Sequence, residues 1–470
     1  MAAKRRDGTV DLTEGNLFKK IILFTLPIIF TGVLQLLFNA ADVVVVGKFA
    51  GDAALAAVGS TGALINLIVS LLIGLSVGAG VCASKCFGAK DKKSMEELVH
   101  TAMLTSIIGG IVIGVIGFIL SKYFLVWMNT HETVIEKATL YVRIYFIGVP
   151  FTIVYNFGAA ILRAVGDTRR PLIFLVISGV INVLFNLGFV ILLKMDVDGV
   201  AIATVIAQVI SCVLVLICLV RTGADYRLDF TRLRIVKDKL KEIIVVGLPA
   251  GIQGSLFSIS NVIVQSSINS FGDIAMSGNA AAANIEGFVY MAMNAFHQTA
   301  MNFTGQHIGA KKENKLGKIA LLCLSCVTVT GLVLGVGAFL LARPLLNIYT
   351  DNPEVVEFGV KRMSYICSIY FVFGIMDVLS GMLRGMNMST VSMVITLLSV
   401  CGLRIVWIMT AFRTFRSLDI LYASYPISWA ACLIVQTIVF VFAYSRIRKR
   451  RKSEGSHEAA VKETAAKVAA

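Results

Sequence analysis

Three acidic side chains, Asp42, Glu286 and Asp377, fall inside long apolar stretches of the chain. A charged group in the middle of a bilayer costs about 3 kcal/mol or more, so an acid in such a stretch indicates a functional site. An acid in this setting can carry a proton or a small cation, or it can attract a cationic ligand.

Asp42 has two polar neighbours on one helical face. Asn39 precedes it by three positions and Gln35 by seven, which aligns the three side chains in a stripe. A stripe that faces an internal cavity would hold a proton or a small cation, with Asp42 as a metal ligand if the ion is Na⁺. Because Asp42 lies toward the outer end of its stretch, a carboxylate that reaches interfacial water is the alternative. Asn182 and Asn186, four residues apart in another stretch, would complete the coordination or would only hydrogen-bond between helices.

Asp377 and Asn156 each lie seven residues before an arginine, at equivalent places in the two halves of the chain. The exchange of an amide for an acid at one repeated position indicates that both side chains point inward. We expect both residues, together with Gln35 of the first stretch, to contact substrate. A buried acid that pairs with another helix, for example through Arg404, is the alternative for Asp377.

Glu286 lies toward the outer end of a further apolar stretch, and Asn294, His297 and Gln298 follow it along the same stretch. We expect these four residues to line the same substrate cavity. A hydrogen-bonded core histidine is the alternative account of His297.

The elements that position these residues are membrane helices. The chain is 57% hydrophobic and 15% charged, whereas soluble domains average about 25% charged residues. Stretches long enough to cross a bilayer as helices are six in each half, at 21–47, 54–82, 98–121, 138–162, 171–193, 198–220, 242–268, 274–303, 317–342, 359–382, 389–412 and 418–444. The alternating polarity of a barrel strand is absent. The sequence therefore predicts an all-α polytopic membrane protein with twelve transmembrane helices in two six-helix repeats.

Short motifs recur in the same order at a spacing of about 221 residues. They are Leu26-Pro27 and Leu248-Pro249, Gly51-Asp52 and Gly272-Asp273, Gly88-Ala89-Lys90 and Gly309-Ala310-Lys311, and Leu162-Arg163 and Leu383-Arg384. A duplicated bundle whose halves rock against each other is the architecture of secondary transporters, which bind substrate at the repeat interface.

The repeat and the basic residues define the expected domains and orientation. With twelve crossings both termini share one side, and that side carries 32 of the 43 Lys and Arg residues. Cytoplasmic loops retain basic residues, so we expect both termini in the cytoplasm of a bacterial cell with the chain in the inner membrane. The expected parts are a cytoplasmic N-terminus at 1–20, lobes at 21–220 and 242–445, a cytoplasmic connector at 221–241, and a basic tail at 446–470 that lacks apolar mass and is expected to be disordered.

Several other classes of function are excluded. The net charge of +15 is divided among many short loops, which argues against nucleic-acid binding. The nine cysteines lie in or beside apolar stretches without the ligand spacing of a zinc site. No phosphate-binding Gly-rich loop or catalytic motif occurs, so neither ATP use nor an enzyme is expected. We expect no cofactor beyond Na⁺ or H⁺ as coupling ion, small organic molecules and the lipid bilayer as partners, and a monomer.

The motifs resemble the multidrug and toxic compound extrusion (MATE) family, prokaryotic branch. The resemblance covers about 15–445 and rests on the two Leu-Pro openings, Asn39-Ala-Ala-Asp42, the Gly-Ala-Lys loops and the segment from Ile161 to Pro171. It implies a cation-coupled antiporter that exports organic cations and other toxic compounds in exchange for Na⁺ or H⁺. It also implies that Asp42 and Asn182 match the family's cation site in the first lobe.

Two departures from the family pattern affect these expectations. Asn186 replaces the more usual Asp at the cation site, and the seventh stretch lacks a Glu that some branches use for coupling. The sequence favours a drug antiporter working by alternating access between two lobes. The alternative is a flippase for lipid-linked precursors, for which a cluster of intramembrane arginines is expected but only Arg404 is evident.

Overall fold

The computed structural model describes residues 9–50, 52–128 and 132–469, and these residues form helices and loops without a strand. The first half consists of α1 (Leu17–Val45), η1 (Val46–Ala50), α2 (Asp52–Ala89), α3 (Lys92–Trp127), α4 (Glu132–Ala164), α5 (Arg169–Leu187), η2 (Gly188–Leu192) and α6 (Val197–Arg221). After the connector with η3 (Phe230–Arg232), the second half consists of α7 (Lys237–Asn269), α8 (Asp273–Gly309), η4 (Glu313–Lys315), α9 (Leu316–Gly331), η5 (Leu332–Val336), α10 (Gly337–Leu340), α11 (Ala342–Leu346), α12 (Pro353–Ile366), η6 (Cys367–Ile369), α13 (Tyr370–Gly385), α14 (Ser389–Thr396), η7 (Leu397–Gly402), α15 (Leu403–Trp407), η8 (Ile408–Phe412) and α16 (Leu418–Ala469).

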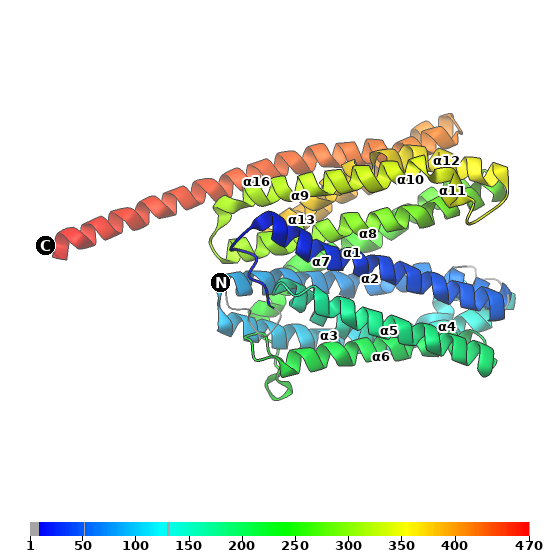
Figure 1. Cartoon of the computed structure of the whole chain (residues 1–470), viewed down its shortest axis with the longest axis horizontal. Coiled ribbons are helices and arrows are strands. Elements are labelled where there is room, and N and C mark those ends of the chain that lie inside the picture. The colour runs from blue at the N-terminus through cyan, green and yellow to red at the C-terminus, as the bar shows by residue number, and fades with distance from the viewer. Residues whose placement is uncertain (1–8, 51, 129–131, 470) are drawn as a thin grey trace.

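The predicted all-α membrane architecture is confirmed. Within the described ranges, eleven helical segments are long and apolar enough to cross a bilayer. α8 is a twelfth helix of 37 residues that is not among those eleven, and it carries the buried polar residues Asn279, Glu286 and His297. The sets α1–α6 and α7–α16 occupy opposite sides of the molecule, with α1, α2, α7 and α8 in the middle (Figure 1).

Helix ends differ from the predicted stretches because helices extend beyond the apolar part of the chain. The tenth span begins at Pro353 rather than at 359, since Asn352 caps α12 by accepting a hydrogen bond from the Glu354 N–H. At the other end of the chain, α16 continues through the polar tail to Ala469, past the predicted end of the last span at 444. That tail is rich in Ala, Glu and Lys, which are strong helix formers.

The start of α1 and the end of α16 lie at the same end of the bundle (Figure 1). We call this the basic end; it includes the α2–α3 corner with Lys90 and Lys92 and the α8–α9 corner with Lys311 and Lys312. At both corners the Gly-Ala-Lys repeat closes a helix with a lysine in the left-handed region, at φ 56° for Lys90 and 53° for Lys311. The repeated motif is therefore a repeated helix C-terminus.

The two halves touch closely where α2 crosses α7. A Cβ atom added at Gly74 would lie 2.1 Å from the backbone nitrogen of Gly251, and one added at Gly78 would lie 2.3 Å from the carbonyl oxygen of Ile243. Only glycine permits this approach, and small residues let helices pack in lipid, where no hydrophobic effect drives their association.

The first helix of each half also packs against the other half near the basic end. Leu17, Ile21 and Phe24 of α1 belong to the same buried apolar cluster as α8, α9 and α13. Ile243 of α7 belongs to the apolar cluster of the first half. The Thr25 and Thr299 hydroxyl oxygens, from α1 and α8, are 2.8 Å apart. The two lobes are thus joined at the basic end.

Candidate ion and substrate sites

The first lobe brings Asp42 of α1 against Asn186 of α5. Gly179 allows the approach, because a Cβ atom there would lie 1.9 Å from Cε2 of Phe38. One helical turn further along α1, the side-chain amide of Asn186 donates a hydrogen bond to Oδ1 of Asp42. Asn186 is fully buried, so this pair sits inside the lobe and not at its surface.

The other predicted residue of this site, Asn182, bonds elsewhere. Its amide donates to the Thr204 hydroxyl of α6 at 3.5 Å. Oδ1 of Asn186 is buried without a hydrogen-bond partner among the described residues. A carboxylate beside an unused amide oxygen is a suitable set of ligands for a monovalent cation, and a carboxylate alone can take up a proton. Thr204 was not predicted, because no spacing or neighbouring residue distinguishes it from the other threonines in apolar spans.

Asn39 and Gln35 lie on the same face of α1 as Asp42. Both side chains are exposed. Leu26, Phe30 and Leu37, which are also exposed, share the opposite face of the same helix. The apolar face is suited to lipid, which leaves the polar stripe with Asp42 on the side of the helix away from lipid.

The second lobe holds a chain of polar groups drawn from three helices. Nδ1 of His297 on α8 lies 3.0 Å from Oδ1 of Asp377 on α13 and 2.8 Å from the main-chain oxygen of Asp377. Nε2 of His297 lies 3.3 Å from a guanidinium nitrogen of Arg384. Another nitrogen of Arg384 donates to Oε1 of Gln253 on α7 at 2.9 Å.

The hydrogen-bonding roles fix the charges in this chain. Arginine can only donate, so Nε2 of His297 accepts and Nδ1 carries the hydrogen that points to Asp377. The imidazole is then neutral and links the carboxylate of Asp377 to the guanidinium of Arg384, and the three groups together have no net charge. Arg404 does not take part, because it lies over the Tyr425 ring at 4.1 Å and donates to Ser428 at 3.1 Å.

Glu286 is engaged in a buried ion pair. Arg362 of α12 donates to both carboxylate oxygens, at 2.9 and 2.7 Å, and also to Oδ1 of Asn279. The Glu286 and Arg362 side chains are each 8% exposed. This geometry is that of a bidentate ion pair linking α8 to α12, in which both carboxylate oxygens are engaged by Arg362 and the charge of Glu286 is balanced. The sequence missed Arg362 because the tenth span was predicted to begin at 359, which placed this arginine at a membrane boundary.

The remaining predicted substrate residues are half-buried and bond locally. Asn156 donates to the carbonyl oxygen of Thr152 in its own helix at 2.8 Å. Gln298 donates to Oδ1 of Asn294 at 2.8 Å, one turn away on α8. These contacts leave parts of the three side chains accessible, but they do not join them to Asp377.

A metal site made from ionisable side chains is absent from the described part of the chain, where no three His, Cys, Asp or Glu residues cluster. A cation held at Asp42 would therefore draw on amide and hydroxyl oxygens. Such neutral oxygen ligands suit Na⁺ better than a transition metal.

Comparison with known proteins matches this architecture. The family model described as MatE matches residues 27–187 and again residues 249–410, one copy in each half. The chain is 28% identical over 397 residues to a probable multidrug resistance protein, YpnP, of Bacillus subtilis, covering 84% of this chain and 88% of the relative. It is 23% identical over 402 residues to an FAD transporter of Shewanella oneidensis, covering 84% and 87%.

A solved structure described as the outward-facing conformation of a multidrug resistance MATE family transporter superposes with a TM-score of 0.88 at 21% identity, covering 94% of this chain and 99% of that one. These matches do not favour the lipid-precursor flippase. The two copies of the family match together cover more than half of the chain, and the chain therefore belongs to the MatE family of membrane transporters and is not an enzyme.

Proposed function

We propose that this chain is a secondary antiporter that exports amphipathic organic compounds, cationic ones in particular, in exchange for Na⁺ or H⁺ entering at Asp42. The observation that carries the proposal is the buried contact between Asp42 and Asn186 at the end of a polar stripe. It offers one acid to one monovalent cation. Since the neighbouring group is a neutral amide, uptake of a single H⁺ or Na⁺ neutralises the site, and we infer one coupling cation per cycle here.

The proposed orientation places the basic end in the cytoplasm of a bacterial cell, as the distribution of Lys and Arg favours. The glycine contacts between α2 and α7 close the lobes toward that end, whereas Gln35 and Asn39, further from it, are exposed. This combination supports an outward-open state, in which Asp42 exchanges its cation with the outside. Alternating access would then open the cytoplasmic side.

The accessible polar groups support an amphipathic substrate. Gln35 and Asn39 offer neutral amides, and Asp377 is 16% exposed with its charge balanced by Arg384 through His297. Of the three acids in apolar stretches, Asp42 is then the one whose charge has no basic partner among the described contacts. A cationic substrate and the coupling cation would both be attracted to it, which is the exchange that an antiporter requires.

The test is efflux of a fluorescent organic cation from proteoliposomes under an imposed Na⁺ gradient or an imposed pH gradient. We expect one gradient to drive efflux by the unmodified chain and Asp42→Asn to abolish that efflux while the protein stays folded. Leu37→Ala, on the opposite, apolar face of the same helix, is the control and should retain most of the activity. Gradient-driven efflux of unchanged rate in the Asp42→Asn variant would exclude Asp42 as the coupling site.

A further inference from the structure

Two short segments at the basic end occupy equivalent positions in the repeat. The first strap, Thr9–Asn16, precedes α1, and the second strap, Thr231–Asp238, runs from the end of the connector into α7. They are related by the offset of 222 residues that separates Leu26 from Leu248. Each strap thus leads into the helix that opens one half of the molecule.

The first strap lies between the two lobes. Gln306, at the end of α8, uses both ends of its side-chain amide: Oε1 accepts from the Leu12 N–H at 2.9 Å and Nε2 donates to the carbonyl oxygen of Ala164 on α4 at 2.7 Å. The Val10 N–H donates to the carbonyl oxygen of Val165 at 3.1 Å. Gln306 is fully buried and Leu12 is 1% exposed. One side chain of the second half therefore holds both the strap and the first half.

Ionic contacts add to this junction. Lys312 donates to the Thr13 hydroxyl at 3.2 Å and lies 3.5 Å from Glu14, and Lys315 donates to the carbonyl oxygen of Thr13 at 3.1 Å. Asp11 is itself held by the N–H and hydroxyl of Thr13, at 2.8 and 2.7 Å. Burial raises the pKa of Asp11, but these two hydrogen bonds and the charge of Lys20 lower it by more. The pKa of Asp11 therefore lies below its usual value. The first strap is acidic and its binding corner is basic.

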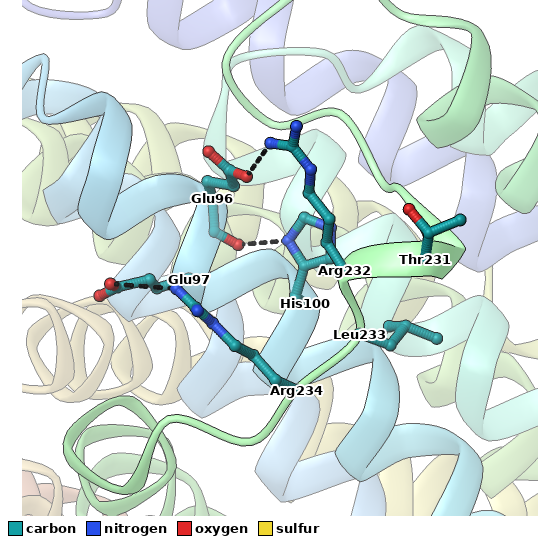
Figure 2. Close-up of a pocket in the computed structure, with 7 residues that line it drawn as sticks. All are labelled: Glu96, Glu97, His100, Thr231, Arg232, Leu233 and Arg234. Carbon is teal, nitrogen blue, oxygen red and sulfur yellow. Dashed lines mark hydrogen bonds and ion pairs between the residues drawn. The ribbon is translucent and has the colours of Figure 1, made fainter.

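The second strap lies on α3 of the first half, and its charges are reversed. Arg232 and Arg234 pair with Glu96 and Glu97 at 3.0 and 3.6 Å (Figure 2). Just before the strap, the Asp229 N–H donates to Nε2 of His100 at 3.1 Å. The two ion pairs and His100 line a cavity of about 480 Å³, together with Thr231 and Leu233. A basic strap thus binds an acidic surface.

The second strap also contacts the first half through its main chain. The Val236 N–H donates to the Thr101 hydroxyl at 3.1 Å. Upstream in the connector, Tyr226 and Leu228 are each 1% exposed and belong to the apolar core of the first half. The connector is therefore attached to one lobe only, up to the first turn of α7. In contrast, the first strap is attached to both lobes at once.

The corners beneath the straps are in reciprocal contact. A Cβ atom added at Gly88 would lie 2.0 Å from the carbonyl oxygen of Gln306, and one added at Gly309 would lie 2.0 Å from that of Lys85. The offset of 221 residues exchanges these two contacts, since 88 corresponds to 309 and 85 to 306. Gln306 is thus fixed by its backbone against α2 as well as by its side chain.

We infer that the first strap and Gln306 form a latch that holds the basic end shut and must release for the lobes to open there, whereas the second strap is a fixed anchor of the connector. The inference rests on the proposed alternating-access cycle. Because Gln306, Leu12 and Ala164 lie in three separate segments, opening the basic end breaks at least one of their two hydrogen bonds. The contacts of the second strap stay within the first half and its connector, so opening need not disturb them.

The two straps supply a matched pair of crosslinks. In a background without the nine native cysteines, Thr13→Cys with Lys312→Cys places thiols across the latch, and Arg232→Cys with Glu96→Cys places them across the anchor. Each pair is joined in proteoliposomes with a short, reducible bifunctional thiol reagent. We expect the latch crosslink to stop efflux and reduction to restore it, whereas the anchor crosslink should leave efflux at the rate of the uncrosslinked variant.

A second measurement needs no crosslink. Cys86 is 8% exposed on α2, at the crossing with α7. In a variant with Cys86 as its single cysteine, Gln306→Leu removes both amide hydrogen bonds, and labelling of Cys86 by a maleimide added at the basic end should accelerate by about tenfold. Thr101→Val, which removes the anchor bond of the second strap, should leave the labelling rate unchanged.

The outcomes separate the latch from the transport function. Normal efflux by the crosslinked latch, or a block of efflux by the crosslinked anchor, overturns the inference. Unchanged labelling of Cys86 in the Gln306→Leu variant also overturns it. If the reduced variants and the unmodified chain all fail to respond to either ion gradient, the proposed antiport fails instead, and the labelling measurement still tests whether Gln306 holds the basic end closed.

Discussion

A site made of one carboxylate and one carboxamide needs fewer cations for neutrality than a site made of two carboxylates. Asp42 with Asn186 needs one monovalent cation for neutrality. Asn186→Asp would place a second acid within hydrogen-bonding distance, where two ionised groups repel strongly. We expect the variant to take up about one further cation per cycle. The ratio of ion flux to substrate flux in proteoliposomes measures this, and an unchanged ratio would show that residue 186 lies outside the ion site.

The charge of Asp377 can be removed without removing its shape. In Asp377→Asn the guanidinium of Arg384 loses the acid that balances it through His297, so the second lobe gains a positive charge. We expect binding of cationic substrates to weaken about tenfold more than binding of neutral ones. Asn294→Ala, an uncharged change on α8, is the control. Equal losses for both classes of substrate in the Asp377 variant would indicate a structural role.

Residue types in apolar stretches located part of these sites. The spacing of Gln35, Asn39 and Asp42 was sufficient to predict one polar face, because a helix fixes the relation between residues three and seven apart. The partner of Glu286 was not predictable in the same way. Arg362 lies 76 residues away along the chain, and periodicity within one helix says nothing about which helix packs beside it.

Glycines determine how close the central helices come. Gly74 faces Gly251 across the α2–α7 crossing, whereas a Cβ atom at Gly62, on the same helix, would meet nothing within 4 Å. Gly74→Ala should therefore force the backbones apart and lower the free energy of unfolding by about 1–3 kcal/mol. Gly62→Ala should be neutral or slightly stabilising, because alanine favours the helix.

Thermal unfolding of the two variants in the same detergent provides the measurement. A lower midpoint for Gly74→Ala alone supports a close crossing at Gly74. Equal midpoints for the two variants would show that the lobes do not approach as closely as this structure has them.

Hydropathy predicted the spans better than their ends. The third span was predicted at 98–121, but α3 runs from Lys92 to Trp127, and its start is set by Asp91, whose side chain accepts from the Ser94 N–H. Polar residues continue a helix outside the bilayer without any apolar signal. The predicted span at 274–303 corresponds to α8, which is not among the helices apolar enough to cross a bilayer by composition, because polar residues such as Asn279 and Glu286 lower its hydropathy.

The repeat also constrains motion of the whole molecule. Its two halves share their corner contacts, their opening helices and their straps, yet the ionic contacts of the straps are opposite in sign. The two repeated halves can therefore close at one end and open at the other. The connector can stay on the first lobe during this motion, because only the first strap contacts both lobes. The basic end is the closed end in this structure, so the other end is the one expected to close next.

Rocking of the two lobes predicts a contact that should form in the inward-facing state. The first and seventh spans are equivalent in the repeat, so their outer ends, near Gly47 and Ser270, should meet across the cleft when the basic end opens. Cysteines at these two positions, in a background without the native nine, should crosslink in the inward-facing state, and the yield should rise when Gln306→Leu is added. The bridge should stop efflux until it is reduced, because it prevents the outward opening at which Asp42 exchanges its cation. If the bridged protein exports substrate at the normal rate, the two halves do not exchange access by rocking.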